Sequence, residues 1–349
     1  MYLVFQTLGT FGSSGCFQTG FILALESVGK SHRVMCGIII EYFFVGGEIL
    51  LTLIAMISHS WQWLTAFPSI FLGILLLTWP IVPESTRWLL TKGKNRQAEA
   101  AILTMAKVNK VGPDFDLDNH RISQNRQNAP VENLLNVIKN WTLGFRFLNT
   151  CFCWLTVTMV YYGLSLNATN LAGNPFLNFI LVSLVEVPGY SASYFTMEKF
   201  GRRKSTALSL FLGSFCCLIS AILTNYSNLT ILTTITFLLG KLGVTWTFGN
   251  IYIYTSELFP TSTRTACVGA CSTSGRIGSI LSPYIASLAL TLPWLPMFIF
   301  GFLALLSGIF VYFFLPETLG RPLPETVAEA ANFQRVSRSE QDENTPLLS

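Results

Sequence analysis

Five ionisable side chains interrupt stretches of the sequence that are otherwise apolar. The acids Glu41 and Glu48 lie seven residues apart, so on a helix they share one face. The other three, Glu186, Lys241 and Arg276, form a set of mixed sign. A charge near the centre of a bilayer costs at least ~2.5 kcal/mol, so such groups normally face a cavity or a partner. A lone pair would fit a structural ion pair, whereas five charges on four segments favour a polar pathway.

Neighbouring side chains could complete a binding site for a small charged ligand. Arg276 stays protonated and can hold a carboxylate through two parallel hydrogen bonds. Trp154, Tyr161 and Tyr162 lie in one apolar stretch, where they could form flat walls or a cation–π surface for a quaternary ammonium. Ordinary helix packing and an interfacial aromatic belt are the alternatives for these rings. For Glu41 and Glu48 we predict an ion-coupling role.

The composition predicts that these residues are held by membrane-spanning helices. Hydrophobic residues make up 51% of the 349 and charged residues 11%, against roughly a quarter charged in soluble domains. This excludes a water-facing surface of ordinary polarity. Stretches of about 20 apolar residues, long enough to cross a bilayer, cover residues 1–25, 35–58, 63–82, 147–166, 175–197, 205–224, 230–256, 266–289 and 294–315.

The distribution of Lys and Arg predicts the orientation of these nine spans. The connections around 59–63, 167–175, 225–230 and 290–293 contain neither residue, while the alternate connections are basic. The positive-inside rule then puts the long central connection and the C-terminus in the cytosol. We expect a multi-pass protein of the plasma membrane, with endosomal or lysosomal membranes as the alternative.

Charged motifs recur at a long interval along the chain. Glu26 and Arg33 bound one eight-residue element, and Glu257 and Arg264 bound its counterpart 231 residues later. Pro-Glu-Ser at residue 83 and Pro-Glu-Thr at residue 316 are separated by 233 residues. Parallel repeats of this size are typical of secondary transporters. The Gly-Arg-Arg-Lys element at 201–204 has no earlier counterpart, so we expect about three of twelve helices to be missing from the start.

These observations predict four parts of the chain. Residues 1–82 form a partial N-terminal bundle of three spans, and 83–146 a cytosolic linker with short helices, one of them over 96–107. Residues 147–318 form a six-helix bundle, and 319–349 a cytosolic tail. The tail ends in a pattern that resembles an acidic dileucine sorting signal for clathrin adaptors, with Glu343, Leu347 and Leu348 as its determinants.

The sequence indicates no catalytic chemistry. It has no phosphate-binding Walker loop, no dinucleotide fingerprint after a strand and no zinc motif. The eight cysteines are scattered through apolar spans without metal-ligand spacing, which favours thiols packed between helices over a disulfide framework. We therefore predict a protein that is not an enzyme, with no metal or cofactor, whose partners are a small organic ion and the lipid bilayer rather than nucleic acid.

The motifs together resemble the major facilitator superfamily and, within it, the organic cation, organic anion and carnitine transporter family. At the superfamily level the resemblance rests on Gly201-Arg202-Arg203-Lys204 and the paired elements described above. At the family level it rests on the segments 83–90, 162–167, 170–174, 186–188, 254–264 and 316–320. The resemblance covers Met1 to about Asn332 and implies an all-α helical bundle, with about nine of twelve transmembrane helices present.

The resemblance also implies a facilitator that alternates between outward-open and inward-open states. Family members that carry anions or carnitine resemble this chain in having arginine at the position of Arg276, so an organic anion or a carnitine-like zwitterion is favoured over a cation. Gln62, where relatives usually have arginine, departs from the family pattern. The residues expected to contact the substrate are Trp154, Tyr161, Tyr162, Glu186, Lys241 and Arg276.

Charge-assisted contacts at the cytosolic face are expected to hold one state of the cycle. The predicted gating residues are Glu26, Arg33, Glu198, Gly201, Arg202, Arg203, Glu257 and Arg264; anchoring of topology is the alternative role for the arginines. Two other functions remain open from the sequence. One is a truncated isoform that binds substrate without transporting it, and the other is a sugar porter.

Overall fold

The computed structural model describes residues 2–28, 33–58, 60–77, 82–86, 89, 94–110, 133–171, 173–260, 263–321, 324 and 326–332. Every regular element among these residues is a helix, so the prediction of an all-α protein is confirmed. Residues Met1–Phe44 and Leu53–Pro130 form one compact unit, and Val45–Thr52 and Val131–Ser349 form a second. The two units are described separately below.

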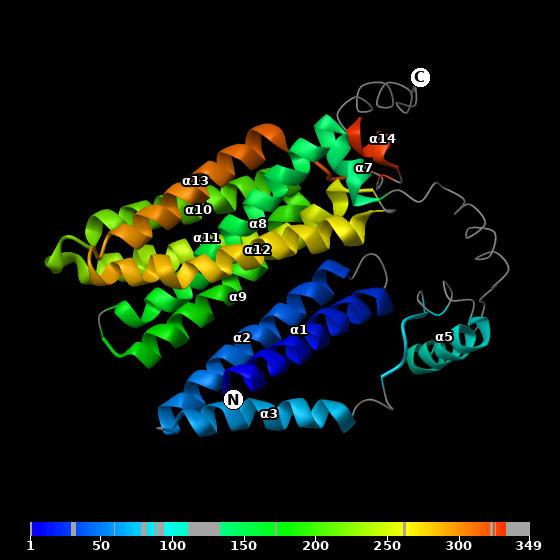
Figure 1. Cartoon of the computed structure of the whole chain (residues 1–349), viewed down its shortest axis with the longest axis horizontal. Coiled ribbons are helices and arrows are strands. Elements are labelled where there is room, and N and C mark those ends of the chain that lie inside the picture. Colours follow the sequence, from blue (N-terminus) through cyan, green and yellow to red (C-terminus); the bar gives the residue numbers. More distant parts are fainter. Residues whose placement is uncertain are drawn as a thin grey trace, which may run out of the picture. The chain divides into compact units, whose positions relative to one another are not determined.

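Four helices are described in the first unit (Figure 1). They are α1 (Tyr2–Ser27), most of α2 (Arg33–Ile57), α3 (Trp61–Leu77) and α5 (Asn95–Asn109). A Cβ at Gly37 on α2 would lie 3.8 Å from the ring of Phe21, so α1 and α2 approach closely here. The short helix predicted over 96–107 is present as α5, and the left-handed residue Lys110 (φ 55°) ends it.

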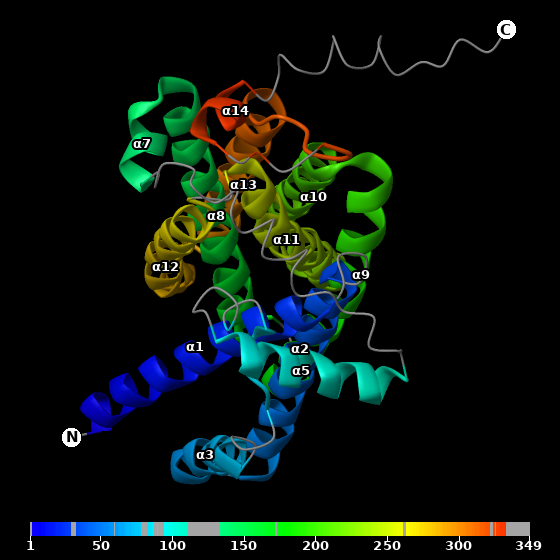
Figure 2. The same ribbon diagram turned by 90° about the vertical axis from the view of Figure 1, so that its right-hand side faces the viewer.

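The second unit is a bundle of six long helices with two short ones at one end (Figures 1 and 2). Asn140 and Asn174 cap two of the long helices by accepting hydrogen bonds from Leu143 N (3.2 Å) and Phe176 N (2.9 Å). The elements are α7 (Leu134–Lys139), α8 (Trp141–Asn167), α9 (Pro175–Phe200), α10 (Arg202–Leu223), α11 (Thr230–Leu258), α12 (Arg264–Ser287), α13 (Leu295–Phe314) and α14 (Val327–Ala331). All six spans predicted over this part of the sequence are helices.

Six of the described helices are long and apolar enough to cross a membrane. They are Met35–Ile57 of α2 together with α8, α9, α10, α11 and α13. The sequence predicted nine, and the difference lies in α1, α3 and α12. Helix α3 has only 17 residues, whereas α1 and α12 are rich in Gly, Ser and Thr, which lower their hydropathy. Small polar residues of this kind are common where helices pack against each other within membranes.

Small residues allow the long helices of the second unit to pack at short range. Helix α8 packs against α12 and α13, and α10 packs against α11 and α13. A Cβ at Gly243 on α11 would lie 2.5 Å from the backbone nitrogen of Gly213 on α10. A Cβ at Gly278 on α12 would overlap the carbonyl oxygen of Leu155 on α8. Both contacts therefore require glycine.

One end of α8 is tied to neighbouring chain segments by buried side chains. Arg146 donates a hydrogen bond to the carbonyl oxygen of Ala330 in α14 (2.8 Å). Asn149 donates to the carbonyl oxygen of Phe310 in α13 (3.0 Å). The bond to Ala330 satisfies a backbone oxygen in the last turn of α14, where intrahelical donors are absent, and the bond to Phe310 ties α8 to α13.

We expect Gly278→Ala to destabilise the bundle, because the new methyl group would force α8 and α12 apart. Overpacking of this kind costs about 1–3 kcal/mol. The measurement is thermal unfolding of the detergent-purified chain. The matched control is Gly269→Ala on the same helix, where a Cβ meets no atom within 4 Å. An equal melting temperature for the two variants would show that the contact at Gly278 is not close in solution.

Candidate functional site

A fully buried ion pair joins α9 to α11 in the second unit. Lys241 Nζ lies 2.8 Å from Glu186 Oε1, and both side chains have no exposed surface. The hydroxyl of Tyr161 on α8 donates to the other carboxylate oxygen of Glu186 (2.7 Å). Lys241 also donates to Ser165 Oγ (2.8 Å) and to the carbonyl oxygen of Tyr161 (3.3 Å). The two charges are thus neutralised by each other and solvated by polar groups from α8.

The sequence around the pair explains how two helix backbones come close enough to form it. Gly189 lies three residues after Glu186, on the same side of α9. A Cβ at Gly189 would lie only 3.1 Å from the carbonyl oxygen of Leu242, the residue after Lys241. The missing side chain therefore lets α9 approach α11 at the level of the pair.

An aromatic row runs from α8 to α11 beside the ion pair. Ring centroids are separated by 5.3 Å between Tyr162 and Tyr161, and by 5.1 Å between Tyr161 and Phe248. The row continues from Phe248 to Tyr252 (5.9 Å) and from Tyr252 to Trp154 (4.5 Å). Trp154 and Tyr161 are buried, whereas the other three rings are partly exposed. The accessible aromatic surface thus comes from Tyr162, Phe248 and Tyr252.

Two members of this row were missed by the sequence analysis. Phe248 and Tyr252 follow Lys241 by seven and eleven residues. At 3.6 residues per turn these spacings bring all three side chains to one face of α11. The spacing from an intramembrane lysine was therefore a usable signal. Trp154, by contrast, was predicted to contact substrate but is buried, and its indole N–H donates to Thr255 Oγ1 (2.9 Å).

Arg276 differs from the other predicted substrate residues because its side chain is exposed. It lies on α12 and interacts with the hydroxyl of Tyr162, at one end of the aromatic row. Among the described residues it forms no ion pair. The bundle therefore presents a guanidinium next to accessible aromatic rings, with the oppositely charged Glu186 withdrawn into the pair with Lys241.

The two acids of α2 fall into different compact units. Glu41 is buried and belongs to the first unit. Glu48 lies in the 45–52 segment that belongs to the second unit, where Ser183 Oγ donates to its Oε2 (2.9 Å). Neither the burial of Glu41 nor the contact of Glu48 tests the predicted ion-coupling role, which stays a prediction.

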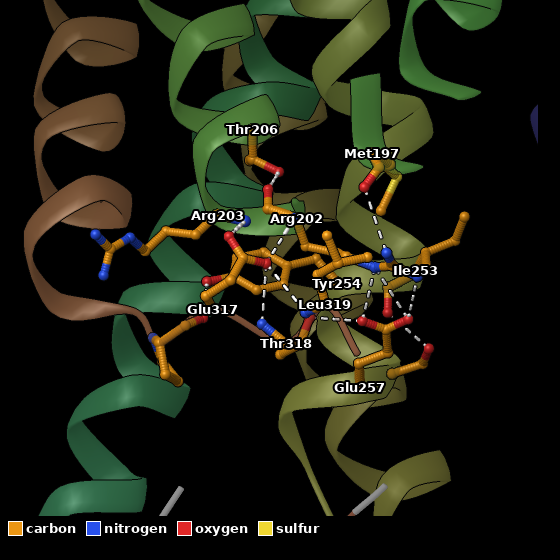
Figure 3. A network of polar contacts seen from close by, with 12 residues as sticks. Met197, Arg202, Arg203, Thr206, Ile253, Tyr254, Glu257, Glu317, Thr318 and Leu319 are labelled. Carbon is orange, nitrogen blue, oxygen red and sulfur yellow. Dashed lines mark hydrogen bonds and ion pairs between the residues drawn. The ribbon is translucent and has the colours of Figure 1, made fainter. Parts of the chain in front are cut away.

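A second polar network lies at the end of the bundle that carries α7 and α14, and Figure 3 shows its side chains. Arg202 meets Glu257 through two guanidinium nitrogens, with Nε 3.0 Å from Oε2 and Nη2 3.1 Å from Oε1. The two side chains are only 16% and 18% exposed. Arg202 Nη1 also donates to the carbonyl oxygen of Met197 (3.3 Å), and Thr318 Oγ1 donates to Glu257. This bidentate pair joins the start of α10 to the end of α11.

Glu317 holds the start of α10 from the opposite side. Its carboxylate accepts hydrogen bonds from the backbone N–H groups of Arg202 (2.7 Å) and Arg203 (3.2 Å). The same carboxylate accepts from the N–H groups of Thr318 (3.0 Å) and Leu319 (3.1 Å). A carboxylate is stabilised there by unpaired amides and by the helix dipole. The residue belongs to a motif quoted in the sequence analysis but received no role there.

Gly201, between α9 and α10, allows this contact. Its φ is 91°, a conformation that favours glycine. A Cβ at this position would lie 2.5 Å from the carboxylate of Glu317. The glycine predicted as a gating residue is thus needed both for the turn and for the approach of Glu317.

The structure brings together only some of the predicted gating residues. The guanidinium of Arg203 lies 5.4 Å from the ring centroid of Tyr312. Glu198 is exposed near the end of α9 and forms no ion pair within the described part of the chain. Arg264 is the first residue of α12. The side chains of Glu26 and Arg33, and the whole segment with Glu343, Leu347 and Leu348, lie outside the described residues.

Comparison with known proteins agrees with the family resemblance. The family described as sugar (and other) transporter matches residues 1–329. The organic cation transporter protein of Drosophila melanogaster is 33% identical over 330 residues, which cover 92% of this chain and 60% of that protein. The organic cation/carnitine transporter 2 of Homo sapiens is 33% identical over 355 residues, which cover 100% of this chain and 62% of that protein. The chain thus spans about three-fifths of the length of these curated relatives.

A solved structure supports the same fold. The inward-open xylose transporter XylE of E. coli superposes with a TM-score of 0.61 at 16% identity, over 90% of this chain and 68% of the other. Identity at this level shows the fold alone. The chain belongs to the sugar (and other) transporter family of the major facilitator superfamily, and its curated relatives are organic cation and carnitine transporters.

Proposed function

We propose that this chain is a multi-pass membrane facilitator, with an alternating-access mechanism, for small organic anions or zwitterions. The observation that carries the proposal is the pairing of Glu186 with Lys241. Because these charges cancel, the charges left near the aromatic row of the second unit are the guanidinium of Arg276 and the carboxylate of Glu48 on the 45–52 segment. A carboxylate suits this guanidinium, since the two can form parallel charge-assisted hydrogen bonds.

The aromatic row could bind the cationic group of a zwitterion whose carboxylate is held by Arg276. Tyr162, Phe248 and Tyr252 are partly exposed, and Tyr162 interacts with Arg276. Such faces attract a quaternary ammonium by about 0.5–2 kcal/mol. They also provide an apolar wall for an aromatic acid. A neutral hexose would use neither the guanidinium charge nor the cation–π surface, so a sugar porter is the less favoured candidate.

The network around Arg202 supports a gate at the end of the bundle near α7 and α14. The pair of Arg202 with Glu257 is bidentate and largely buried. Hydrogen bonds to charged groups contribute about 1.5–3 kcal/mol. That is enough to favour one state, and a substrate can shift the equilibrium by its differential affinity for the two. The distribution of Lys and Arg supports a cytosolic location for this end, and we propose the plasma membrane as the site of the protein.

Substitution of Arg276 tests the proposed substrate class. In membrane vesicles containing this chain, uptake of L-carnitine and of salicylate should exceed that of tetraethylammonium and of D-glucose. Arg276→Gln should weaken uptake of the two carboxylates about 10- to 100-fold, because a charge-assisted hydrogen bond is worth about 1.5–3 kcal/mol. Arg96→Gln, on α5, is the control for a simple loss of charge.

Three results would contradict this proposal. The first is carboxylate uptake by Arg276→Gln equal to that of Arg96→Gln. The second is uptake of D-glucose that L-carnitine does not inhibit, which would favour a sugar porter. The third is binding of L-carnitine to the purified chain without any uptake, which would favour a form that binds without transport.

A double-mutant cycle tests the buried pair. Glu186→Gln leaves the ammonium of Lys241 buried without its counter-ion, so we expect a loss of about 3–5 kcal/mol of folding stability. Combining it with Lys241→Met removes the unpaired charge and should restore most of that loss. Thermal unfolding in detergent measures both effects. A double variant at least as unstable as the sum of the two single variants would show that the side chains are not coupled.

The contacts of Glu317 generate a prediction for the gate. Glu317→Gln keeps the shape of the side chain but removes the charge that the start of α10 stabilises. We expect the melting temperature to fall by about 2–6 °C, given roughly 1–1.5 kcal/mol for the charge–dipole interaction. The rate of L-carnitine uptake by the Glu317→Gln variant should also change, because the gate contains this contact. Glu99→Gln, on an exposed side chain of α5, should leave both quantities unchanged, and similar effects in the two variants would count against a gate at Glu317.

A further inference from the structure

Two cysteines from different helices meet within the second unit, at a place that the proposed mechanism does not use. Cys151 Sγ on α8 lies 3.6 Å from Cys271 Sγ on α12. Cys271 is buried, while Cys151 is partly exposed. All eight cysteines of the chain are free thiols. The pair is therefore reduced and lies close to bonding distance.

Hydrogen bonds hold the backbones of α8 and α12 together next to this thiol pair. Ser274 Oγ donates to the carbonyl oxygen of Cys151 (2.9 Å). Further along both helices, Thr158 Oγ1 donates to the carbonyl oxygen of Gly275 (2.6 Å). The sulfur atoms need to approach by about 1.5 Å to reach the ~2.05 Å of a disulfide.

Neighbouring cysteines do not share this geometry. Cys267 lies one turn before Cys271 on α12, and its sulfur donates to Thr263 Oγ1 (3.9 Å). Cys153 is buried on α8 and interacts with Ser307 of α13. Both are thus internal controls, since each lies on the same helix as one member of the pair but contacts a different group.

We propose that Cys151 and Cys271 form an oxidisable dithiol, which a hydroperoxide converts into a disulfide that links α8 to α12. The thiolate of the accessible Cys151 attacks one peroxide oxygen, the O–O bond breaks, and water leaves after protonation. The sulfur of Cys271 then attacks the resulting sulfenic acid at Cys151. The S–S bond forms, the S–O bond breaks, and a second water leaves. Two thiols and one hydrogen peroxide give one disulfide and two waters.

The disulfide would act on the helices that carry the proposed substrate contacts. Helix α8 holds Tyr162 and α12 holds Arg276, whose side chains interact. A covalent link between these helices fixes their spacing and prevents them from moving apart. Oxidation is therefore expected to slow uptake, and dithiothreitol to restore it. This effect on uptake rests on the proposed function, whereas formation of the bond does not.

Peptide mass spectrometry of the whole chain in membranes tests the bond. Membranes are treated with hydrogen peroxide, remaining thiols are alkylated, and the protein is digested. We expect a peptide that joins Cys151 to Cys271, two hydrogens lighter than the sum of its parts and cleaved by dithiothreitol. It should be lost completely in Cys151→Ser and in Cys271→Ser. It should persist in Cys153→Ser and in Cys267→Ser.

The same experiment distinguishes the competing outcomes. Linked peptides that contain Cys267 or Cys153 in similar amounts would overturn the assignment, because they would show unspecific oxidation. Sulfinic acid at Cys151 with Cys271 still alkylated would also overturn it. If serine variants are unstable, the unsubstituted chain still decides, since the identity of the joined peptides is read directly. A linked peptide in a chain that takes up no substrate would support the dithiol and count against the proposed function.

Discussion

The ion pair between Glu186 and Lys241 is the interaction on which the arrangement of the second unit depends. Two fully buried charges in an apolar environment are tolerated only when they are close and when hydrogen bonds satisfy their remaining donors and acceptors. That condition requires α9 and α11 to approach at Gly189 and requires α8 to supply Tyr161 and Ser165. The positions of three helices are thus coupled through one pair of charges.

The pair also limits what the proposed site can recognise. With Glu186 neutralised by Lys241, the charges left beside the aromatic row for a ligand are the exposed Arg276 and the carboxylate of Glu48, to which Ser183 donates. The aromatic row connects the two regions, because Tyr161 bonds to Glu186 and its neighbour Tyr162 interacts with Arg276. A change at the guanidinium can therefore be transmitted to the buried pair through two adjacent tyrosines. The charge of a ligand at Arg276 would thus affect the packing of α8 against α9 and α11.

The sequence was sufficient to predict the helices and the intramembrane charges, because hydropathy and the cost of burying a charge depend on local composition. It was not sufficient to predict which side chains pair with each other. Glu186 and Lys241 were interpreted as ligands for a substrate charge, although they neutralise each other's charge across 55 residues of sequence. Glu317 was recognised within a motif, but its role depends on a turn at Gly201 that brings it to the start of α10. Nine spans were predicted where six described helices qualify, because α3 is short and the small polar residues of α1 and α12 lower their hydropathy. Helix rotation and close approach, which decide the partners of Glu186, Lys241 and Glu317, arise only from tertiary packing.

The two charged regions differ in a way that suits a conformational cycle. An ion pair that must break and reform needs partial access to water, because water then hydrates the separated charges. The charges of a fully buried pair would be separated without that hydration, at a high cost in free energy. Arg202 and Glu257 meet the first condition, with 16% and 18% of their side chains exposed, and Glu186 and Lys241 meet the second, with none. In the proposed cycle, the network at the end of the bundle is the part that opens, and the pair of Glu186 with Lys241 moves as one body with α8, α9 and α11. A substrate bound at Arg276 would then act on α12, the helix whose long contact with α8 depends on glycine and small hydroxyl groups rather than on charge.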